Sequence, residues 1–566
     1  MSSSLVARQK LKPEIQTASS ASPVFKEVAD QVGLKFQHYN GMTGKFYLPE
    51  ITGSGAALFD FDNDGDLDVF LVQGNVLEPN TKVAGTLFPW TGPETPRGKL
   101  FRNDLEVGRG ISFTDVTEKS GIVATGYGMG VAVGDINNDG LLDLYLSNLG
   151  SNQMYLNKGE GKFADVTKEK GTDDPRWSTS AAFFDYDRDS WLDLMIVNYA
   201  NFSVTNSPTC YSATTAKDYC TPRVFRAPGN RLFHNKGNGA FEDVTVAAGI
   251  DKEFGHGLGV VTADFDDDGW IDIYVANDGD QNQLWINEKN GRFKNDALLA
   301  GAAVNRNGQV EAGMGVDAGD FDGNGTEDIF VTHLMDETNI LYLNQGRALF
   351  EDRTREAGLG MPGRRFTGFG TLFFDYDNDG WLDLLVANGA VQLLPDLLRK
   401  KDHFPLGQPN QLFHNTGKGS FVEVVDPTLQ PLEVSRGAAF GDVDNDGDTD
   451  VLITNNNGPV RLLLNQVGNR NHWLGLRFVG KTGSRDMLGT QVEVVVSKDK
   501  VLRRRARTDG SYLSANDPRV LVGLVTTVNL EAVRVRWPDG MVEEWKDILL
   551  DRYTTLKQGS TKSKKL

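Results

Sequence analysis

The sequence predicts an all-β fold with a large repeated part and a small C-terminal β-domain. Three observations lead to this prediction. A nine-residue Asp-rich pattern occurs seven times, short strand patterns flank every copy, and the C-terminal segment has strand patterns but no Asp-rich pattern. At 566 residues the chain is long enough for both parts.

The Asp-rich pattern first reads DFDNDGDLD, from Asp60 to Asp68. The other copies are DINNDGLLD from Asp135, DYDRDSWLD from Asp185, DFDDDGWID from Asp264, DFDGNGTED from Asp320, DYDNDGWLD from Asp375 and DVDNDGDTD from Asp442. Oxygen side chains occupy positions 1, 3, 5 and 9, and position 7 can offer its carbonyl oxygen. Such a loop suits a hard cation, and Ca²⁺ fits best because it accepts about six to eight oxygen ligands.

We therefore predict up to seven calcium ions. The predicted ligands are Asp60, Asp62, Asp64, Asp66, Asp68; Asp135, Asn137, Asp139, Leu141, Asp143; Asp185, Asp187, Asp189, Trp191, Asp193; Asp264, Asp266, Asp268, Trp270, Asp272; Asp320, Asp322, Asn324, Thr326, Asp328; Asp375, Asp377, Asp379, Trp381, Asp383; and Asp442, Asp444, Asp446, Asp448, Asp450. Ser190 replaces the position-6 glycine, and Asn137 and Asn324 replace carboxylates, so we expect these three copies to be the weakest or vacant sites.

An EF-hand and a solvated acidic loop are the alternatives for this pattern. An EF-hand needs a bidentate Glu at position 12, where all seven copies have an apolar residue, from Leu71 to Ile453. A solvated loop is plausible for one copy, but seven copies in phase disfavour it. The flanking runs, such as GAALF before and LDVFLV after the first copy, are strand patterns. Each loop is therefore predicted to join two strands of a hairpin.

A longer unit surrounds each loop and contains about four strands. It opens with an F-x-D-V-T-like strand, first at Phe25, and closes with a strand that ends in Asn, as in LFRN, MYLN and LFHN. Loop starts are 50 to 79 residues apart. Four-strand repeats of this length are typical of propeller blades. We predict a seven-bladed β-propeller over residues 25–468, with small residues such as Gly55 and Gly130 at its crowded axis.

The D-x-D-x-D-G-x-x-D hairpins within F-x-D-V-T blades resemble the FG-GAP or VCBS repeats of integrin α-subunit propellers. Residues 469–556 resemble the ASPIC/UnbV domain, which follows such propellers in the cartilage acidic protein family and its bacterial relatives. The second resemblance depends on the order of these residues: Asn471, His472, Trp473, Gly489, Asp509, Gly510, Gly523, Trp537, Pro538 and Gly540. In this domain the basic run from Arg503 to Arg507 is expected to be a solvated edge or a contact with the acidic propeller. An anion site is the alternative, which is disfavoured because alternate strand residues face opposite ways.

Composition and termini limit the partners and the compartment. The formal charge of −19 argues against nucleic acid, and no apolar run is long enough to span a membrane. Residues 1–24 are expected to be a disordered leader without a signal-peptide core, and residues 557–566 a disordered basic tail. The calcium loops favour a secreted, extracellular or periplasmic protein. Cys210 and Cys220 suit one disulfide, although two unpaired cysteines are the alternative.

A ligand surface is predicted on the face opposite the loops. If the strand before each loop is innermost, insertions at residues 74–98, 199–230 and 388–410 cluster on that face. The side chains expected to rim the channel there are Glu50, Tyr127, Trp177, His256, Arg365 and Arg436. Ordinary packing and solvated loop tips are the alternative for this row of residues.

Two classes of function remain. No metalloprotease, nucleophile-elbow, phosphate-loop or dinucleotide motif is present in the sequence, and His234 and His414 share one repeat position, which favours a structural role. The integrin-like and cartilage-protein resemblance implies a binding or adhesion module that recognises a protein or glycan. The bacterial resemblance implies the alternative, an enzyme or accessory protein in an enediyne-type pathway or in polysaccharide processing. The sequence leaves the oligomeric state open.

Overall fold

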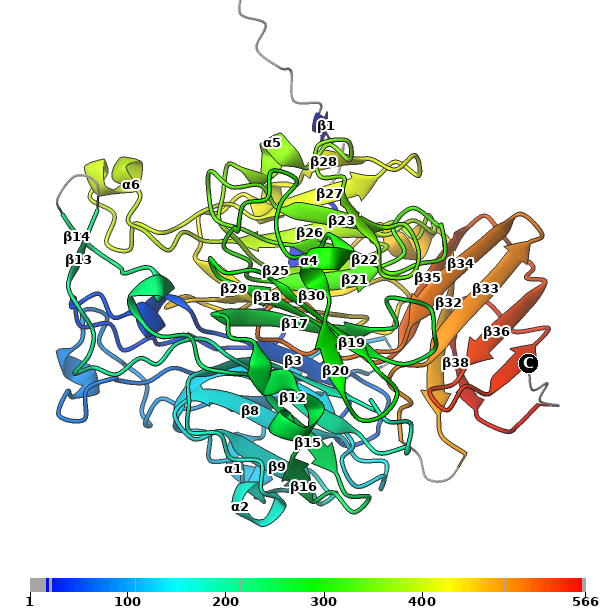
Figure 1. Ribbon diagram of the computed structural model, residues 1–566, viewed down its shortest axis with the longest axis horizontal. Coiled ribbons are helices and arrows are strands. Elements are labelled where there is room, and N and C mark those ends of the chain that lie inside the picture. Colours follow the sequence, from blue (N-terminus) through cyan, green and yellow to red (C-terminus); the bar gives the residue numbers. More distant parts are fainter. Residues whose placement is uncertain (1–16, 20–22, 107, 213–215, 482–484, 562–566) are drawn as a thin grey trace, which may run out of the picture.

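The computed structural model describes residues 17–19, 23–106, 108–212, 216–481 and 485–561. Over these residues the chain forms seven four-stranded antiparallel sheets, one of which gains a fifth strand, and then a separate pair of sheets at its C-terminal end. Figure 1 shows the C-terminal sheets on the right and the longest insertions, with β13, β14 and α6, on the left. The prediction of a repeated β-part followed by a small β-domain is confirmed at this level.

The seven sheets follow each other along the chain, and each is described from its innermost strand outward. The first holds β3 (Ala56–Phe59), β4 (Asp68–Leu71), β5 (Lys99–Asn103) and β6 (Phe113–Asp115). The second holds β7 (Tyr127–Gly134), β8 (Asp143–Leu149), β9 (Gln153–Asn157) and β10 (Phe163–Asp165). The third holds β11 (Ser178–Phe184), β12 (Asp193–Asn198), β15 (Arg231–Asn235) and β16 (Phe241–Asp243).

The remaining four sheets repeat the same order. The fourth holds β17 (Gly257–Ala263), β18 (Asp272–Asn277), β19 (Gln283–Asn287) and β20 (Phe293–Asn295). The fifth holds β21 (Val316–Gly319), β22 (Asp328–Val331), β23 (Ile340–Asn344) and β24 (Phe350–Asp352). The sixth holds β25 (Gly368–Phe374), β26 (Asp383–Asn388), β27 (Gln411–Asn415) and β28 (Phe421–Val425). The seventh holds β29 (Ser435–Gly441), β30 (Asp450–Asn455), β31 (Arg461–Asn465) and β2 (Phe25–Glu27).

The innermost strands form a closed ring. Strand β3 contacts β7, the contacts continue through β11, β17, β21, β25 and β29, and β29 contacts β3. Side chains alternate along each strand and so pack toward opposite neighbours. Ala57 and Phe59 share a core cluster with the second sheet, whereas Ala56 and Leu58 share one with the seventh. These packed interfaces between sheets are the main hydrophobic core.

The N-terminal end of the repeated part completes the last sheet. Strand β2 pairs antiparallel with β31, with Phe25 opposite Asn465. This arrangement corrects the predicted repeat unit. Each F-x-D strand is the fourth strand of the sheet whose Asp-rich loop precedes it, and the first F-x-D strand belongs to the seventh sheet. Sequence spacing alone could not show the offset, because it appears only when the two ends of the ring form hydrogen bonds.

Short helices connect the sheets. Four one-turn helices follow a fourth strand: α1 (Thr117–Ser120), α2 (Thr167–Lys170), α3 (Thr245–Ala248) and α4 (Ala297–Ala300). Helix α5 (Gly360–Gly363) lies between the fifth and sixth sheets, whereas α6 (Pro395–Arg399) lies in the insertion between β26 and β27 of the sixth sheet. The hairpin of β13 (Cys210–Tyr211) and β14 (Lys217–Asp218) lies in the third-sheet insertion. None of the described helices is long and apolar enough to cross a membrane.

The C-terminal part has its own core between two sheets. One contains β35 (Val520–Val525), β32 (His472–Val479) and β38 (Tyr553–Lys557). The other contains β34 (Lys500–Arg505), β33 (Gln491–Ser497), β36 (Ala532–Arg536) and β37 (Val542–Trp545). Leu474, Val494 and Trp537 are buried between them. The domain boundaries predicted from sequence stay a proposal.

The predicted disordered ends fall partly among the described residues. Residues 17–19 of the expected leader form β1 (Thr17–Ser19), which pairs parallel with β28, while residues 1–16 and 20–22 lie outside the described part. Lys557 of the expected tail ends β38, and the amide of Thr561 donates a hydrogen bond to Glu543. Residues 562–566 lie outside the described part.

A segment of the C-terminal part fills the axis of the ring. This axial segment, residues 507–517 between β34 and β35, makes hydrogen bonds to all seven innermost strands. Its backbone pairs with Ala56 and Leu58 of β3, Val131 of β7 and Val316 of β21. The backbone amide of Leu513 donates to the hydroxyl of Ser180 in β11. The side chains of Asp509 and Ser511 bond to Thr262 of β17, Thr371 of β25 and Ala438 of β29.

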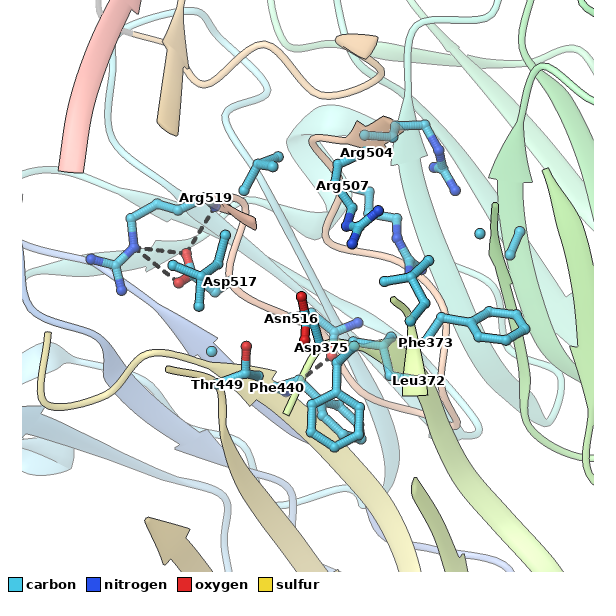
Figure 2. Close-up of a pocket in the computed structure, with 18 of the residues that line it drawn as sticks. Leu372, Phe373, Asp375, Phe440, Thr449, Arg504, Arg507, Asn516, Asp517 and Arg519 are labelled. Carbon is cyan, nitrogen blue, oxygen red and sulfur yellow. Dashed lines mark hydrogen bonds and ion pairs between the residues drawn. The ribbon is translucent and has the colours of Figure 1, made fainter. Parts of the chain in front are cut away.

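The close approach of this segment explains the small residues of the innermost strands. A Cβ atom added to Gly55 would lie 1.8 Å from the carbonyl oxygen of Leu513. The crowded axis predicted from the glycine row is therefore present, but a second part of the chain crowds it. Figure 2 shows Arg504, Arg507 and Asn516 beside the strands that carry Phe373 and Phe440.

The basic run is a contact with the ring, one of its two expected roles. Arg504 donates a hydrogen bond of 3.0 Å to the carbonyl of Gly380, and Arg507 forms an ion pair with the fully buried Asp317. Arg503 instead pairs with Glu493 inside the C-terminal part. Arg505, next to Arg504, also contacts the ring by donating to the carbonyl of Thr262, so the contacts of the run do not follow the alternation of strand side chains.

Candidate metal centres

Each Asp-rich loop is a tight turn between the first two strands of a sheet. Positions 4 and 6 have positive φ angles, which are 60° for Asn63 and 97° for Gly65 in the first copy. Glycine adopts this conformation without strain, which explains its place at position 6. In the third copy Ser190 takes the same conformation, with φ 72°, so the chain keeps the turn at some cost.

Hydrogen bonds of two carboxylates fix every loop. The amide of residue 6 donates to the position-1 carboxylate, as Gly65 does to Asp60 at 3.0 Å. One oxygen of the position-9 carboxylate accepts the amide of residue 2, as Asp68 does from Phe61 at 2.9 Å. The first bond recurs in the other six copies, and so does the second.

The loops bring carboxylates from positions 1, 3 and 9 together. In the first copy, oxygens of Asp60, Asp62 and Asp68 lie within 4.8 Å of one another, and the third and fourth copies have the same cluster. Several of these oxygens are buried and accept no hydrogen bond: Asp62 Oδ1, Asp185 Oδ1, Asp320 Oδ1, Asp377 Oδ1 and Asp444 Oδ1. Such orphaned oxygens fit a bound hard cation. The full ligand sets, including the position-7 carbonyls, stay a prediction.

The electrostatics of the metal-free loops also fit a cation. Burial, with smaller contributions from neighbouring carboxylates, raises the pKa of Asp68 to about 9 and that of Asp60 to about 6. Burial likewise raises the pKa of Asp193 to about 7. A divalent ion at the centre of each cluster would favour the charged carboxylates and reverse these shifts.

The C-terminal part places cationic side chains near the position-1 carboxylates. Arg477 lowers the pKa of Asp60, and Arg504 lowers that of Asp375, although burial outweighs both effects. Arg519 donates a hydrogen bond of 2.8 Å to the backbone carbonyl of Asp442. In these three loops the arginines of the C-terminal part therefore lie near the position-1 residue.

Sequence reasoning missed the role of the Asn that ends each third strand. These residues are Asn103, Asn157, Asn235, Asn287, Asn344, Asn415 and Asn465. The backbone amide of each donates to the position-9 carboxylate of its own loop. Each side-chain amide donates to the carbonyl of residue 2 in the preceding loop around the ring. The sevenfold recurrence of Asn was the available signal.

Replacing one of these asparagines is expected to weaken the ring. Asn344 is fully buried, and its side chain donates to the carbonyl of Phe265 at 2.8 Å. Asn344→Ala removes this bond and the second side-chain bond to the carbonyl of Glu327 at 3.1 Å, so we expect the free energy of unfolding to fall by about 1–3 kcal/mol. Urea denaturation in saturating calcium measures the change. Asn290→Ala, in an exposed turn, is the control. An equal effect of both substitutions would contradict the idea that Asn344 holds neighbouring sheets of the ring together.

On the opposite face, the structure buries most of the predicted rim. Five of its six residues are buried, none of them more than 8 % exposed: Glu50, Tyr127, Trp177, His256 and Arg436. Arg436 donates to the carbonyls of Ile51 and Ala390 and lies over the ring of Phe369. His256 forms an ion pair of 2.7 Å with Asp280, and the partly exposed Arg365 pairs with Glu423. The axial segment and the insertions cover this row, and its contact with a ligand stays a prediction.

The insertions do gather on this face and enclose two cavities. Phe88 and Phe404, from the first and third predicted insertions, have ring centroids 5.5 Å apart. A cavity of about 580 Å³ is lined by Tyr127, Trp177, Phe202, Arg176, Asn201 and Ser203. A second, of about 350 Å³, is lined by Tyr199, Tyr219, Cys220, Asp278 and Phe369. Cys210 and Cys220 form the predicted disulfide beside this cavity.

Comparisons with known proteins agree with these repeats. The family described as FG-GAP-like repeat matches residues 135–196, 224–275, 264–331, 320–386 and 403–480, and the family described as ASPIC and UnbV matches residues 480–563. Cartilage acidic protein 1 of Mus musculus is 25% identical over 351 residues, which are 60% of this chain and 49% of that protein. The Xenopus tropicalis protein is 24% identical over 438 residues, 67% of this chain and 62% of that protein. The chain spans about half the length of the mammalian relatives it matches.

Solved structures with similar folds include two lectins. A lectin from Agrocybe aegerita, described as recognising non-reducing terminal N-acetylglucosamine, has a TM-score of 0.35 at 15% identity, over 66% of this chain and 90% of that chain. The BP39L lectin from Burkholderia pseudomallei has a TM-score of 0.40 at 10% identity, over 73% and 96%. Scores this low do not carry an argument about ligand or mechanism.

Proposed function

Because the chain belongs to the family of FG-GAP-like repeat proteins with a C-terminal ASPIC/UnbV domain, we propose that it is a calcium-stabilised binding module of the secreted, extracellular or periplasmic space. In this proposal the seven sheets are the blades of a seven-bladed β-propeller, and calcium occupies the loops on one face. A protein or glycan ligand binds on the opposite face. The disulfide supports a compartment outside the cytosol, and the calcium that we predict for the loops is also more abundant there.

The observation that carries the proposal is the division of the molecule into two faces. One face holds the acidic loops and is covered by the C-terminal part. The other holds the insertions, whose cavity of about 580 Å³ combines the aromatic walls of Tyr127, Trp177 and Phe202 with the polar groups of Arg176 and Asn201. Concave sites with apolar walls and a few polar groups are typical of small-ligand pockets. A sugar residue fits this chemistry, so glycans are the first class to test.

A glycan array probed with the calcium-loaded protein tests this function. Asn201→Trp places a large side chain at the mouth of the cavity, because Asn201 is exposed and lines it. We expect this substitution to abolish the binding of any glycan that the protein captures. Lys236→Trp, at an exposed position on the loop side, is the matched control and is expected to bind normally. Binding that survives Asn201→Trp would overturn the cavity as the site, and release of cleaved sugar would favour the enzyme alternative.

A further inference from the structure

Two of the seven loops differ from the others in chemistry. The residue before the Asn that ends the third strand is His234 in the third sheet and His414 in the sixth. The other sheets have Arg, Leu or Ile there: Arg102, Leu156, Ile286, Leu343 and Leu464. The third and sixth loops also share Tyr at position 2, and the rings of Tyr186 and Tyr376 lie 5.9 and 6.0 Å from the imidazoles of His234 and His414.

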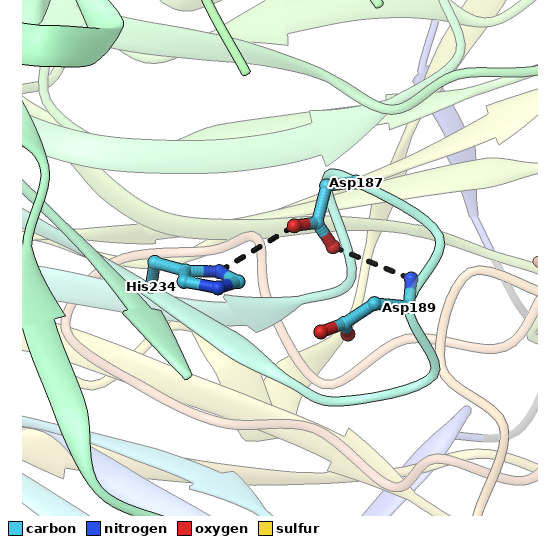
Figure 3. Close-up of side chains that lie close together, drawn as sticks. All are labelled: Asp187, Asp189 and His234. Atoms are coloured by element: carbon cyan, nitrogen blue, oxygen red, sulfur yellow. Dashed lines mark hydrogen bonds and ion pairs between the residues drawn. The ribbon is translucent and has the colours of Figure 1, made fainter. Parts of the chain in front are cut away.

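Both imidazoles point into the carboxylate clusters. His234 Nδ1 lies 3.1 Å from Asp193 Oδ1 and 3.5 Å from Asp187 Oδ2. His414 Nδ1 lies 3.3 Å from Asp383 Oδ1 and 3.6 Å from Asp377 Oδ2. Figure 3 shows His234 facing Asp187, with Asp189 beside them, and ligand atoms of these three residues lie within 4.8 Å of one another. The equivalent atoms of Asp377, Asp379 and His414 form the same cluster.

These separations fit ligands that share one small metal ion. Two ligand atoms on an ion with bonds of about 2.0–2.2 Å lie roughly 3–3.5 Å apart when the geometry is tetrahedral. A second observation also indicates a ligand. Asp185 is only 5% exposed, yet its Oδ1 accepts no hydrogen bond and its carboxylate belongs to the cluster with Asp187 and Asp193. In the sixth loop the buried Asp377 Oδ1 also accepts no hydrogen bond.

We propose that the third and sixth loops are mixed imidazole–carboxylate sites that select a divalent first-row transition ion of the zinc class over calcium. Neutral imidazole is a good ligand for such ions, whereas calcium takes oxygen ligands almost exclusively. The five loops without a histidine keep oxygen ligands alone and remain calcium sites. The inference rests on the proposed function to the extent that the loops bind cations at all. It adds that one ring holds two metal specificities.

The surroundings of His234 and His414 also allow these residues to serve as metal ligands. His234 and His414 lie next to Asn235 and Asn415, whose amides hold the position-9 carboxylates of the same loops. The imidazole rings are about one quarter to one third exposed, so the two clusters lie near the surface of the protein. In the second, fifth and seventh sheets leucine fills the same place, so the sheet does not require histidine for packing.

Cobalt binding in excess calcium tests the proposal. Protein stripped with EDTA and refilled with calcium is titrated with Co²⁺, whose visible absorption reports nitrogen ligands and low coordination number, and bound metal is counted by mass spectrometry. We expect about two Co²⁺ ions per chain that calcium does not displace. His234→Leu and His414→Leu should each remove one of them and weaken Co²⁺ affinity at that site by at least about 10- to 100-fold. His472→Leu, an exposed histidine of the C-terminal part, should remove none.

The possible outcomes distinguish the proposal of two mixed sites from the proposal that the loops bind calcium. Calcium that binds and raises the melting temperature, together with cobalt that calcium displaces completely, would overturn the mixed sites and leave the calcium loops intact. Cobalt retained equally by the double variant His234→Leu/His414→Leu would also overturn them. A protein that binds neither ion would contradict both proposals. Since leucine occupies this position in three other sheets, folding of the variants can be checked by their melting in calcium.

Discussion

Removal of calcium with excess EGTA is expected to lower the melting temperature by many degrees, and returning calcium should restore it. An ion that binds only the folded protein stabilises it by RT ln(1 + [L]/Kd), about 2.7 kcal/mol for each site at 100 times the Kd. Several filled loops would therefore contribute a large part of the stability. Differential scanning calorimetry during stepwise return of calcium measures this effect, with magnesium as the control ion. Equal melting temperatures with and without calcium would contradict the calcium loops.

The same experiment has a pH signature. In the metal-free protein burial raises the pKa of Asp68 to about 9 and that of Asp193 to about 7, above the unfolded value near 4. A raised folded pKa contributes stability at low pH that is lost as the pH rises through that value. In EGTA the melting temperature should therefore fall between pH 5 and about pH 9. In saturating calcium the carboxylates are held ionised, and this fall should be absent.

Disrupting the axial segment is expected to have an effect of similar size. Tyr512 and Leu513 are at most 1% exposed and belong to the cluster that also contains Ile51, Met129 and Phe369. Truncating a buried Leu or Tyr of this kind costs about 2–5 kcal/mol. We expect Tyr512→Ala/Leu513→Ala to lower the melting temperature of the whole ring in saturating calcium.

The control for this prediction is Val528→Ala, at a 64% exposed position in the loop after β35 of the same C-terminal part. It should melt like the parent protein. A second variant replaces residues 508–517 with a Gly-Ser linker of equal length and should lose the cooperative transition of the ring. If both axial variants melted like the parent protein, the ring would be stable without its axis and the segment would be only a surface contact.

The local geometry of the candidate metal centres could largely be predicted from the sequence. Oxygen side chains at positions 1, 3, 5 and 9 and the glycine at position 6 are local requirements of one loop. The positive φ of Gly65 and the gathered carboxylates of Asp60, Asp62 and Asp68 follow from nine consecutive residues. The hairpin strands and the disulfide between Cys210 and Cys220 are also local, since their partners are at most a few tens of residues apart.

Other features could not be predicted from the sequence because they join residues far apart in the chain. The pairing of Phe25 with Asn465 and the hydrogen bond from Asn103 to Val443 exist only after the ring closes. The predicted channel rim is another example, because no local pattern shows that Trp177 and His256 would be covered by distant insertions. The roles of His234 and His414 also depend on strand pairing, which brings each imidazole to a loop roughly 30 to 50 residues earlier in the sequence.

The sequence by itself thus determined the repeat, the four-stranded sheets, the loop chemistry and the family, because each depends on short-range spacing and turn geometry. Only the tertiary structure decided how the ring closes, that the axial segment fills its centre, which face stays accessible and which loops receive a histidine. The physical reason is that Leu513 reaches Val131 and Ser180, more than 300 residues earlier, through backbone hydrogen bonds and close packing. Such contacts use groups that nearly every residue carries, so they leave no distinctive pattern in the sequence.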